Sequence, residues 1–320
     1  MTREHIEIAI IGGGPGGLAA ALYAARGRAN TVVFERGIPG GQIITTDCVE
    51  NYPGFPGGIT GAELGDLMTR QAEEHGAVLR TFSPVDAISH LDDGHFLLES
   101  EGEEFEADIV IVATGAVPRK LGIPGEAEFT GHGVSWCATC DGALFKEKVV
   151  AVVGGGDAAV EEALFLTKFA SKVHLIHRRD EFRATKCIQE RCRVNPKIQE
   201  HLSRVPVEIV GAEGKVSGIR LESTKDEPEE YVDLDGVFIF VGVHPMNELV
   251  VGLTDLSPDG YIKIDHDGRT NVPGLFAAGD VTDSELKQVI TAAAKGASAA
   301  FEALRYLDES TECSLSTSGS

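Results

Sequence analysis

The chain has 320 residues, 42% of them hydrophobic, which is enough for two domains that each have a hydrophobic core. Its 28 Lys and Arg residues face 50 Asp and Glu residues, so the formal net charge is −22 and neither nucleic acid nor an anionic membrane is expected as a partner. No apolar run approaches the ~20 residues that span a bilayer, and the first residues lack the pattern of a signal peptide, so we expect a cytoplasmic protein.

The first predicted unit begins with a strand and a glycine-rich turn. The apolar run Ile6–Ile11 predicts a buried strand, and the Ala-rich segment Leu18–Arg26 predicts a helix. A second strand is expected over Thr31–Glu35. Strand, turn, helix and strand together form a βαβ unit of the usual size.

The turn of this unit has the glycine pattern of a dinucleotide-binding loop. Its glycines, from Gly12 to Gly17, permit a tight turn whose backbone N–H groups approach a pyrophosphate at the start of the helix. Glu35, at the end of the second strand, would accept hydrogen bonds from ribose hydroxyls. An ordinary glycine turn is the alternative, but the spacing of strand, helix and acid favours a nucleotide site.

A CxxC pair follows further along the chain. Cys137 and Cys140 are separated by two residues, and Asp141 comes directly after them. A lone close pair in a cytosolic chain is typical of a redox-active dithiol or of a metal site. Zinc needs two more ligands, and Cys187 and Cys192, five apart on a predicted helix, point to different faces. We therefore expect no metal, and favour a redox dithiol with Asp141 as proton donor to a leaving thiolate.

A second βαβ unit comes after the CxxC pair. His177 follows Gly154 by 23 residues, just as Glu35 follows Gly12, so the two units repeat at the level of the fold. The expected strand, glycine-rich turn, helix and strand are Lys148–Val153, Gly154–Ala159, Val160–Phe169 and Lys172–His177.

The second unit ends in basic residues where the first has a carboxylate. His177 is followed by Arg178 and Arg179, and Arg183 is close behind. A carboxylate at this position favours the free 2′-hydroxyl of NAD, whereas guanidinium groups suit the 2′-phosphate of NADP. A solvated basic turn is the alternative. In a chain of net charge −22, three arginines at this position favour NADPH.

The second unit is expected to be inserted into the first. Ala116–Arg119 contains a proline that interrupts a strand, so it indicates a linker. The apolar run Gly236–Gly242 closes the second unit, and Val243–Pro245 returns the chain. Gly274–Asp280 and an Ala-rich helix over Gln288–Tyr306 then complete the first unit.

The order of these motifs predicts a chain of electron carriers. One nucleotide cofactor would deliver electrons, a second would relay them, and the dithiol would pass them on, as in a flavin-dependent disulfide reductase. The predicted fold class is α/β, with two Rossmann-like (three-layer ββα) dinucleotide-binding domains. We expect an FAD-binding domain of residues 1–116 and 246–308, an NADPH-binding domain of residues 117–245 that carries the CxxC pair, and a disordered tail of residues 309–320.

From about Ile6 to Leu307 the chain resembles the low-molecular-weight, NADPH-dependent thioredoxin reductases of bacteria and archaea. The resemblance implies FAD and NADPH as cofactors, thioredoxin or a thioredoxin-like protein as partner, and a homodimer. The motifs that carry it are IIGGGPGGLAAALYAAR, GGQIITT, ENYPGFP, VATGAVPR, CATCDG, VVGGGDAAVEEALFL, HRRDEFRA and FAAGDV.

The resemblance also implies residue roles. Cys140 would lie next to the flavin, Cys137 would attack the disulfide of the partner, and Asp141 would protonate the released thiolate. Lys287 occupies a position that is often arginine in this family. The implied FAD contacts are Gly12, Gly14, Pro15, Gly17, Glu35, Gly40, Gly41, Gln42, Thr46, Asn51, Ala113, Thr114, Gly115, Gly279, Asp280, Lys287, Gln288 and Val289. The implied NADPH contacts are Gly154, Gly156, Asp157, Ala159, Glu161, His177, Arg178, Arg179 and Arg183.

Two other functions stay open. The same fold could use ferredoxin or a reduced deazaflavin as electron donor, but the intact second glycine motif and its three arginines argue against this. The chain could also be a non-catalytic, flavin-binding redox-sensing module. Such a protein would be expected to lose Cys140, Asp141 or a nucleotide motif, and all of them are present.

Overall fold

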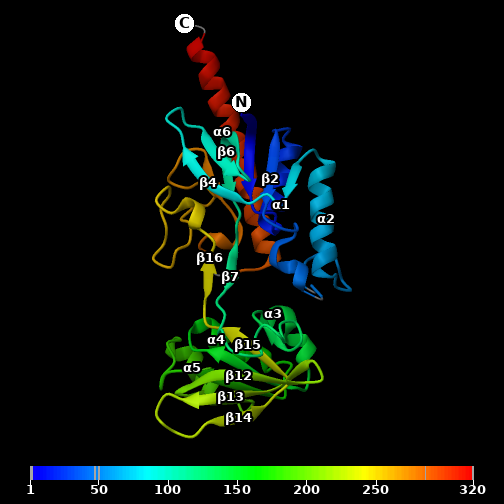
Figure 1. The fold of residues 1–320 in the computed structure, drawn as a ribbon, viewed down its shortest axis with the longest axis vertical. Coiled ribbons are helices and arrows are strands. Elements are labelled where there is room, and N and C mark those ends of the chain that lie inside the picture. The colour runs from blue at the N-terminus through cyan, green and yellow to red at the C-terminus, as the bar shows by residue number, and fades with distance from the viewer. Residues whose placement is uncertain (1–2, 47, 50, 285, 319–320) are drawn as a thin grey trace. The chain divides into compact units, whose positions relative to one another are not determined.

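The computed structural model describes residues 3–46, 48–49, 51–284 and 286–318, without the side chains of Thr45 and of residues 311–318. The chain divides into two units (Figure 1). Unit 1 comprises Met1–Val117 and Pro245–Ser320, and unit 2 comprises Pro118–His244. The boundaries expected from the sequence lie one residue away from these. The chain passes between the units through β7 (Ala116–Pro118) and β16 (Val243–Pro245), which pair with each other.

Unit 1 is built on a seven-stranded sheet. Its strands are β1 (Glu4–Ile11), β2 (Thr31–Glu35), β3 (Val78–Thr81), β4 (Val85–His90), β5 (Phe96–Ser100), β6 (Glu103–Val112) and β17 (Leu275–Ala277). The order is β3-β2-β1-β6-β5-β4, and β17 also pairs with β6. The pairs among β1, β2, β3, β6 and β17 are parallel, whereas β5 pairs antiparallel with both β4 and β6.

The central strand of unit 1 is buried on both faces. Ile8 and Ile10 of β1 pack in one core with the helices, while Ala9 and Ile11 pack in a second core on the other side. This alternation follows from the two-residue period of a strand and explains why the second half of β1, Ile8–Ile11, is apolar throughout. The helices of the unit are α1 (Pro15–Arg26), α2 (Gly61–Glu74) and α6 (Val289–Ser318).

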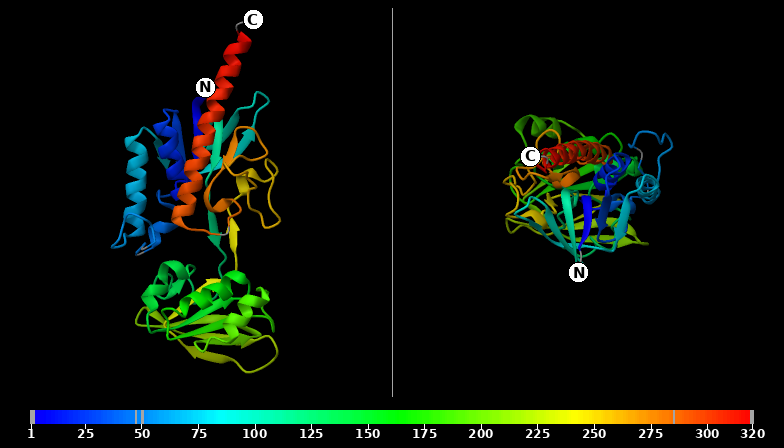
Figure 2. Two further views of the ribbon diagram at one scale, coloured as in Figure 1. Left: turned by 180° about the vertical axis from the view of Figure 1, so that it is seen from behind. Right: turned by 90° about the horizontal axis from the view of Figure 1, so that it is seen from above.

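Helix α6 packs closely against α1. A Cβ atom at Gly296 would lie 1.9 Å from the carbonyl oxygen of Gly16, so the two helices touch through their backbones. The last turns of α6 project from unit 1 and carry the C-terminus (Figure 2). The prediction that the tail is disordered from residue 309 differs from the structure, in which α6 continues to Ser318. The polar segment contains no proline or glycine before Gly319 that would end the helix. Among the described residues, no helix is long and apolar enough to cross a membrane.

Unit 2 contains two sheets. The parallel sheet has the order β11-β10-β9-β15-β8, and the antiparallel sheet has the order β12-β13-β14. The parallel strands are β8 (Val134–Ser135), β9 (Val149–Gly154), β10 (Lys172–His177), β11 (Ile198–Leu202) and β15 (Gly236–Phe240). The antiparallel strands are β12 (Arg204–Ala212), β13 (Lys215–Ser223) and β14 (Glu230–Asp233).

The layers of unit 2 follow from the alternation along β9. Val150 and Val152 pack with α4 (Asp157–Leu166) and α5 (Lys186–Arg193), whereas Ala151 and Val153 pack against the antiparallel sheet. The unit is therefore a sheet covered by a second sheet on one face and by helices on the other. This arrangement confirms the predicted three-layer ββα fold.

Short helical turns occur where the chain leaves the sheets. They are α3 (Ala138–Asp141) and the 3-10 turns η1 (Gly41–Thr45), η2 (Gly142–Phe145), η3 (Glu248–Val250) and η4 (Gly279–Val281). Three of these turns contain residues that the sequence analysis assigned to a site.

Candidate active site

The first glycine turn lies at the carboxyl end of β1. Gly12 follows this strand with a φ of 107°, a left-handed conformation that favours glycine. A Cβ atom at Gly12 would stand 2.4 Å from the carbonyl oxygen of Ala113, and one at Gly17 would stand 1.8 Å from that of Gly12. The turn therefore admits no side chains at these two positions. The N–H groups in the first turn of a helix have no partner within the helix and are the kind of group that binds an anion.

Glu35 at the end of β2 is held beside this turn. Its Oε2 accepts a hydrogen bond from the backbone N–H of Gly13 at 2.7 Å, and its Oε1 accepts one from the N–H of Gly37 at 2.8 Å. Both oxygens keep further acceptor capacity, because a carboxylate offers about four lone-pair sites. The structure thus fixes the carboxylate at the edge of the glycine turn.

The loop that follows β2 packs on the same turn. The N–H of Gly40 donates to the carbonyl oxygen of Gly13 at 2.7 Å. Gly41 has a φ of 64°, and a Cβ atom there would lie 2.9 Å from the Cα of Gly14. The two loops are therefore in backbone contact, and only glycine permits this approach.

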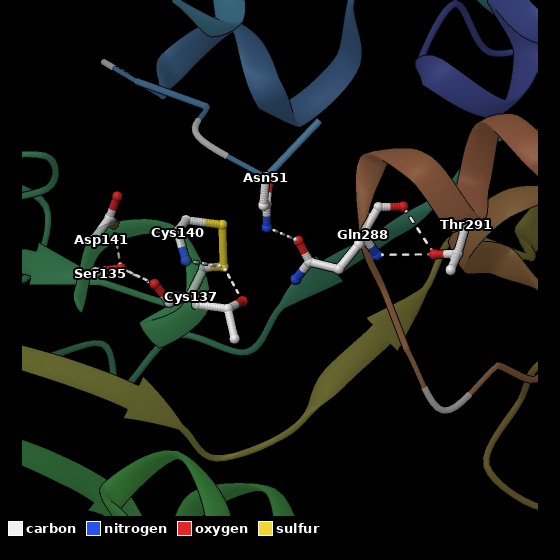
Figure 3. Close-up of a disulfide and its surroundings, with 8 residues drawn as sticks. Asn51, Ser135, Cys137, Cys140, Asp141, Gln288 and Thr291 are labelled. Carbon is white, nitrogen blue, oxygen red and sulfur yellow. Dashed lines mark hydrogen bonds between the residues drawn. A yellow bond between two sulfur atoms is a disulfide. The ribbon is translucent and has the colours of Figure 1, made fainter. Parts of the chain in front are cut away.

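Hydrogen bonds connect polar side chains from separate segments of unit 1. Gln42 donates through Nε2 to the carbonyl oxygen of Ala116. Asn51 donates through Nδ2 to Oε1 of Gln288 at 3.0 Å (Figure 3). The backbone N–H of Gln288 in turn donates to the hydroxyl of Thr291 at 3.1 Å. These bonds join the loop after β2 to the segment that leads into α6.

Asp280 lies near two lysines. Burial raises the pKa of its carboxyl group, and the charges of Lys287 and Lys295 partly offset this rise. Lys287 donates through Nζ to the carbonyl oxygen of Asp280 at 3.1 Å and lies over the ring of Tyr261, 4.2 Å from its centroid. Lys295 donates to the hydroxyl of Thr282 at 2.8 Å. Lys295 was not expected from the sequence, in which its only signal is a single lysine in an Ala-rich helix.

The expected FAD residues gather at one edge of the sheet in unit 1. β1, β2, β6 and β17 are parallel neighbours, so their carboxyl ends meet at the same edge. In open α/β sheets, ligands bind at this edge. At this edge Glu35 is the last residue of β2, and the residues that follow the other strands are Gly12–Gly14, Ala113–Gly115 and Gly279–Asp280.

The second glycine turn follows β9, and a basic loop returns to it. The N–H of Arg183 donates to the carbonyl oxygen of Gly155 at 2.7 Å. The N–H of Thr185 donates to Oδ1 of Asp157 at 2.7 Å. The segment with the three arginines is thus tied to the turn at two points, and Thr185 is a contact that the sequence analysis missed.

The ring of His177 packs directly on this turn. A Cβ atom at Gly155 would stand 2.2 Å from its Nδ1. Burial lowers the pKa of His177, and the charges of Arg179, Arg183 and Arg178 lower it further. The three guanidinium groups are exposed, yet their charges all act on the same ring, so the structure brings them together around the end of β10.

Two further expected NADPH contacts lie on α4. Glu161 is exposed on α4, and no hydrogen bond among the described residues ties it to the turn. Ala159, by contrast, is fully buried at the start of the same helix. Glu162 is half-buried, and both burial and the charge of Glu161 raise its pKa.

The CxxC pair is oxidised in the structure. Cys137 and Cys140 form a disulfide, with their Cα atoms 5.3 Å apart (Figure 3). Cys137 precedes α3, and its Sγ accepts a hydrogen bond from the N–H of Cys140 at 3.2 Å. Its Sγ also lies 3.4 Å from the hydroxyl oxygen of Thr139. The short helical turn therefore holds the two sulfur atoms at bonding distance.

A buried serine connects the disulfide to its neighbouring acid. The hydroxyl of Ser135 donates to Oδ2 of Asp141 at 2.5 Å and accepts from the N–H of Cys137 at 3.0 Å (Figure 3). Ser135 thus fixes the carboxylate relative to the CxxC turn. Ser135 was not expected from the sequence, in which its position two residues before Cys137 is the only signal.

Among the cysteines whose side chains the structure describes, Cys48, Cys187 and Cys192 are free thiols. Cys192 is buried, and burial followed by the charge of Glu200 raises its pKa to about 11. Cys187 is exposed on the opposite side of α5, as its spacing predicted, and Cys48 is half-buried. The side chain of Cys313 lies outside the described residues.

Comparisons with known proteins agree with this architecture. Residues 6–296 match the family described as pyridine nucleotide-disulphide oxidoreductase, the class that two nucleotide-type folds and a redox-type disulfide define. A thioredoxin reductase of Listeria monocytogenes is 44% identical over 310 residues, which are 96% of each chain. One of Mycolicibacterium smegmatis is 47% identical over 306 residues, which are 95% of this chain and 97% of the relative.

A solved structure is similar over nearly the whole chain. The thioredoxin reductase of Streptococcus pyogenes has a TM-score of 0.89 and 41% sequence identity, covering 96% of this chain and 100% of the other. The chain belongs to the pyridine nucleotide-disulphide oxidoreductases and, within them, to the low-molecular-weight thioredoxin reductases.

Proposed function

We propose that this protein transfers two electrons from NADPH, through FAD, to the Cys137–Cys140 disulfide and from there to an oxidised thioredoxin. The observation that carries the proposal is the disulfide itself. It lies in unit 2, in which three exposed arginines follow β10 next to the glycine turn, and the carboxylate of Asp141 is hydrogen-bonded to Ser135 beside the disulfide. The relatives named thioredoxin reductases support the choice of the protein substrate.

FAD is proposed for unit 1. The glycine turn excludes side chains at Gly12 and Gly17, so its backbone can approach a pyrophosphate. Glu35 would accept hydrogen bonds from the adenosine ribose, and Asp280 would lie on the ribityl side. Bound there, the flavin would supply the hydride chemistry that side chains lack. The further contacts in this proposal are Gly14, Pro15, Gly40, Gly41, Gln42, Thr46, Asn51, Ala113, Thr114, Gly115, Gly279, Lys287, Gln288 and Val289.

NADPH is proposed for unit 2. The turn over Gly154–Gly156 would receive the pyrophosphate, and the three arginines would bind the 2′-phosphate. The pairing of Arg183 with Gly155 supports this site, because it ties the basic loop to the turn. The further contacts in this proposal are Asp157, Ala159, Glu161 and His177.

The dithiol would carry out the exchange with the protein substrate. Once the disulfide is reduced, the thiolate of Cys137 would attack a sulfur of the thioredoxin disulfide and form a mixed disulfide. Cys140 would then attack Cys137, which releases the second thioredoxin thiolate and restores the Cys137–Cys140 bond. Two electrons pass to thioredoxin, and two protons accompany them.

Asp141 would supply a proton to the departing thiolate. Its carboxyl group accepts a hydrogen bond from the hydroxyl group of Ser135, and this bond keeps Asp141 beside the CxxC turn. Ser135 is therefore a positioning residue in this proposal, because it acts through Asp141 and through the N–H of Cys137.

The oligomeric state and the cellular location of the protein are also proposals. We infer a homodimer in the cytoplasm. The large apolar side chains of Tyr23 on α1 and Phe301 on α6 are exposed, at 48% and 60%, and they support association through these helices. Light scattering on the purified protein would measure its mass in solution, and a monomer at micromolar concentration would exclude the dimer.

An electron-donor assay tests the function. The purified yellow protein is mixed with a thioredoxin and a disulfide dye, and NADPH, NADH, reduced ferredoxin or a reduced deazaflavin is supplied in turn. Turnover with NADPH supports the proposal. Turnover only with ferredoxin or deazaflavin would replace the donor, and no turnover with any donor would favour a redox-sensing module.

Single cysteine variants test the proposed roles. The Cys140→Ser variant should trap thioredoxin as a mixed disulfide through Cys137. The Cys137→Ser variant should form no such adduct, while its flavin spectrum should respond to the remaining thiolate of Cys140. Trapping by the Cys137→Ser variant alone would reverse the two roles.

A further inference from the structure

Two histidines and an acid lie close together in unit 1, on β1, on β6 and just before β5. His5 lies near the start of β1, Asp108 lies on β6, and His95 directly precedes β5. β6 pairs with both of the other strands, and its Glu106 stands opposite His5 in the parallel register. Glu106 and Asp108 are two residues apart on one strand, so their side chains share a face of the sheet.

The distances among these side chains suit a metal ion. Nε2 of His5 lies 2.8 Å from Oδ1 of Asp108, and Nδ1 of His95 lies 3.6 Å from the same oxygen. One ligand atom from each residue falls within 4.8 Å of the other two. Ligand atoms around a tetrahedral zinc ion, at about 2.1 Å from the metal, are about 3.4 Å apart. The three atoms therefore need only small shifts to share one ion.

One ligand atom of the cluster is buried and lacks a hydrogen bond. Nδ1 of His95 has no hydrogen-bond partner among the described residues. Oε1 of Glu106 lies 3.4 Å from it, which is too long for a strong hydrogen bond but suits a fourth ligand. Glu106 is also shared with Arg3, whose Nη1 lies 3.9 Å from its other oxygen. Glu106 therefore makes only long contacts with its two partners and is the weakest of the four candidate ligands.

We propose that His5, His95 and Asp108 bind a divalent transition-metal ion of the zinc or nickel type, with Glu106 or water as the fourth ligand. Imidazole nitrogens suit Zn²⁺, Ni²⁺ and Cu²⁺, whereas Mg²⁺ and Ca²⁺ prefer sites made of oxygen ligands. Two imidazoles in a set of three therefore select against the hard cations. Among the described residues, this is the one place where three such ligands converge.

The site is separate from the proposed nucleotide site of the same unit. His5 lies near the beginning of β1, and the glycine turn begins after its last residue, Ile11. The six residues between them correspond to about 20 Å of strand. Metal at this position would join β1, β6 and β5 without touching the residues proposed to bind FAD.

Zinc titration followed by calorimetry tests the proposal. The FAD-loaded protein is kept oxidised, so that the Cys137–Cys140 pair remains a disulfide, and accessible thiols are first blocked with iodoacetamide. Zinc chloride should bind at about one ion per chain. The His5→Gln/His95→Gln variant and the Asp108→Asn variant should each weaken binding at least about tenfold.

A third histidine serves as the matched control. His266 is exposed and pairs with Asp267 outside the cluster, so the His266→Gln variant should bind zinc as the unchanged protein does. Flavin absorbance and circular dichroism check that every variant is folded. If the double variant does not fold, the zinc affinity of the Asp108→Asn variant alone tests the metal site. No zinc binding by the unchanged protein, or equal binding by Asp108→Asn, would overturn the proposal.

Discussion

The two glycine turns of this protein have the same backbone plan and opposite chemistry at one position. Glu35 and His177 both lie 23 residues after the first glycine of their turns, and both contact the second glycine. Glu35 accepts a hydrogen bond from the N–H of Gly13, while the ring of His177 packs on Gly155. The shared βαβ geometry positions a side chain at the turn, and the identity of that side chain sets the charge that a nucleotide meets there.

The two turns also differ in how closely the helix approaches. Gly17 and Ala159 are both five residues after the first glycine of their turns. In unit 1 even a methyl group at Gly17 would collide with the carbonyl oxygen of Gly12, whereas in unit 2 the methyl group of Ala159 is present and buried. The helix of unit 1 therefore lies nearer to its strand. Two copies of one fold can thus tolerate different residues at equivalent positions.

The largest expected effect comes from placing the alanine of unit 2 at the equivalent position of unit 1, in the Gly17→Ala variant. Gly17→Ala places a Cβ atom 1.8 Å from the oxygen of Gly12, so the turn must move, and overpacking of this kind costs about 1–3 kcal/mol or more. We expect the variant to purify largely without FAD and with a lowered Tm. Flavin absorbance and thermal unfolding measure both effects.

The matched control is Ala159→Gly in unit 2. It removes one methyl group from a helix and should cost about 1 kcal/mol, with FAD content unchanged. Equal flavin loss in the two variants would show that the helices do not differ in their approach.

Acid should destabilise unit 2 in particular, because the buried histidines among the described residues all lie there. Burial, followed by the charges of His201 and Lys172, lowers the pKa of His174 from 6.5 to about 4, and Glu230 opposes this. The folded state therefore binds fewer protons than the unfolded state, so stability is complete above pH 6.5 and is lost as the pH falls toward 4. This histidine should contribute at most about 3 kcal/mol to the loss.

Calorimetric unfolding between pH 4 and pH 7 measures this loss. The His174→Gln variant should lose less stability over that range, since the group that must take up a proton is gone. His266→Gln, which removes an exposed histidine, is the control. An unchanged pH slope in the His174→Gln variant would assign the acid sensitivity to other groups.

The arginines at the end of β10 should decide the choice of nucleotide. Removing two of them by Arg178→Ala/Arg179→Ala takes away charge-assisted hydrogen bonds to the 2′-phosphate, each worth about 1.5–3 kcal/mol. We expect the KM for NADPH to rise at least about tenfold and that for NADH to change little. Steady-state kinetics with both nucleotides measure the difference.

An exposed arginine elsewhere in unit 2 provides the control. Arg191 lies on α5, so Arg191→Ala should leave the KM for NADPH unchanged. An equal rise in KM for NADPH and NADH in the double variant would remove these arginines from the phosphate site.

The smallest expected effect comes from changing His177, the residue equivalent to Glu35 in the second turn. His177→Glu would give the second turn the carboxylate of the first, which can accept hydrogen bonds from a free 2′-hydroxyl but repels a 2′-phosphate. We expect the preference for NADPH over NADH, as a ratio of kcat/KM values, to fall several-fold. His177→Gln, which adds no charge, should change this ratio less. A ratio that stays the same in both variants would mean that position 177 does not face the ribose.

Much of the fold could be predicted because local patterns specify it. The strand over Thr31–Glu35 was placed at its observed bounds, and the apolar runs of β1 and β9 were placed to within two residues. Helix ends were less accurate. α1 begins at Pro15 rather than Leu18, because a proline suits the first helical position. α6 continues through the polar segment that was expected to be disordered, since nothing in that segment ends a helix.

By itself, the sequence determined the order of the chemistry: a glycine turn with an acid, a CxxC pair with an acid, and a glycine turn with arginines. Each of these signals is local, because the residues involved are joined by a few bonds or by one βαβ spacing. Only the tertiary structure decided which distant residues act on them. Lys295 lies near Asp280, and His5 of β1 lies near His95, which directly precedes β5. Such contacts depend on strand register and helix packing, which place residues together without regard to their separation along the chain.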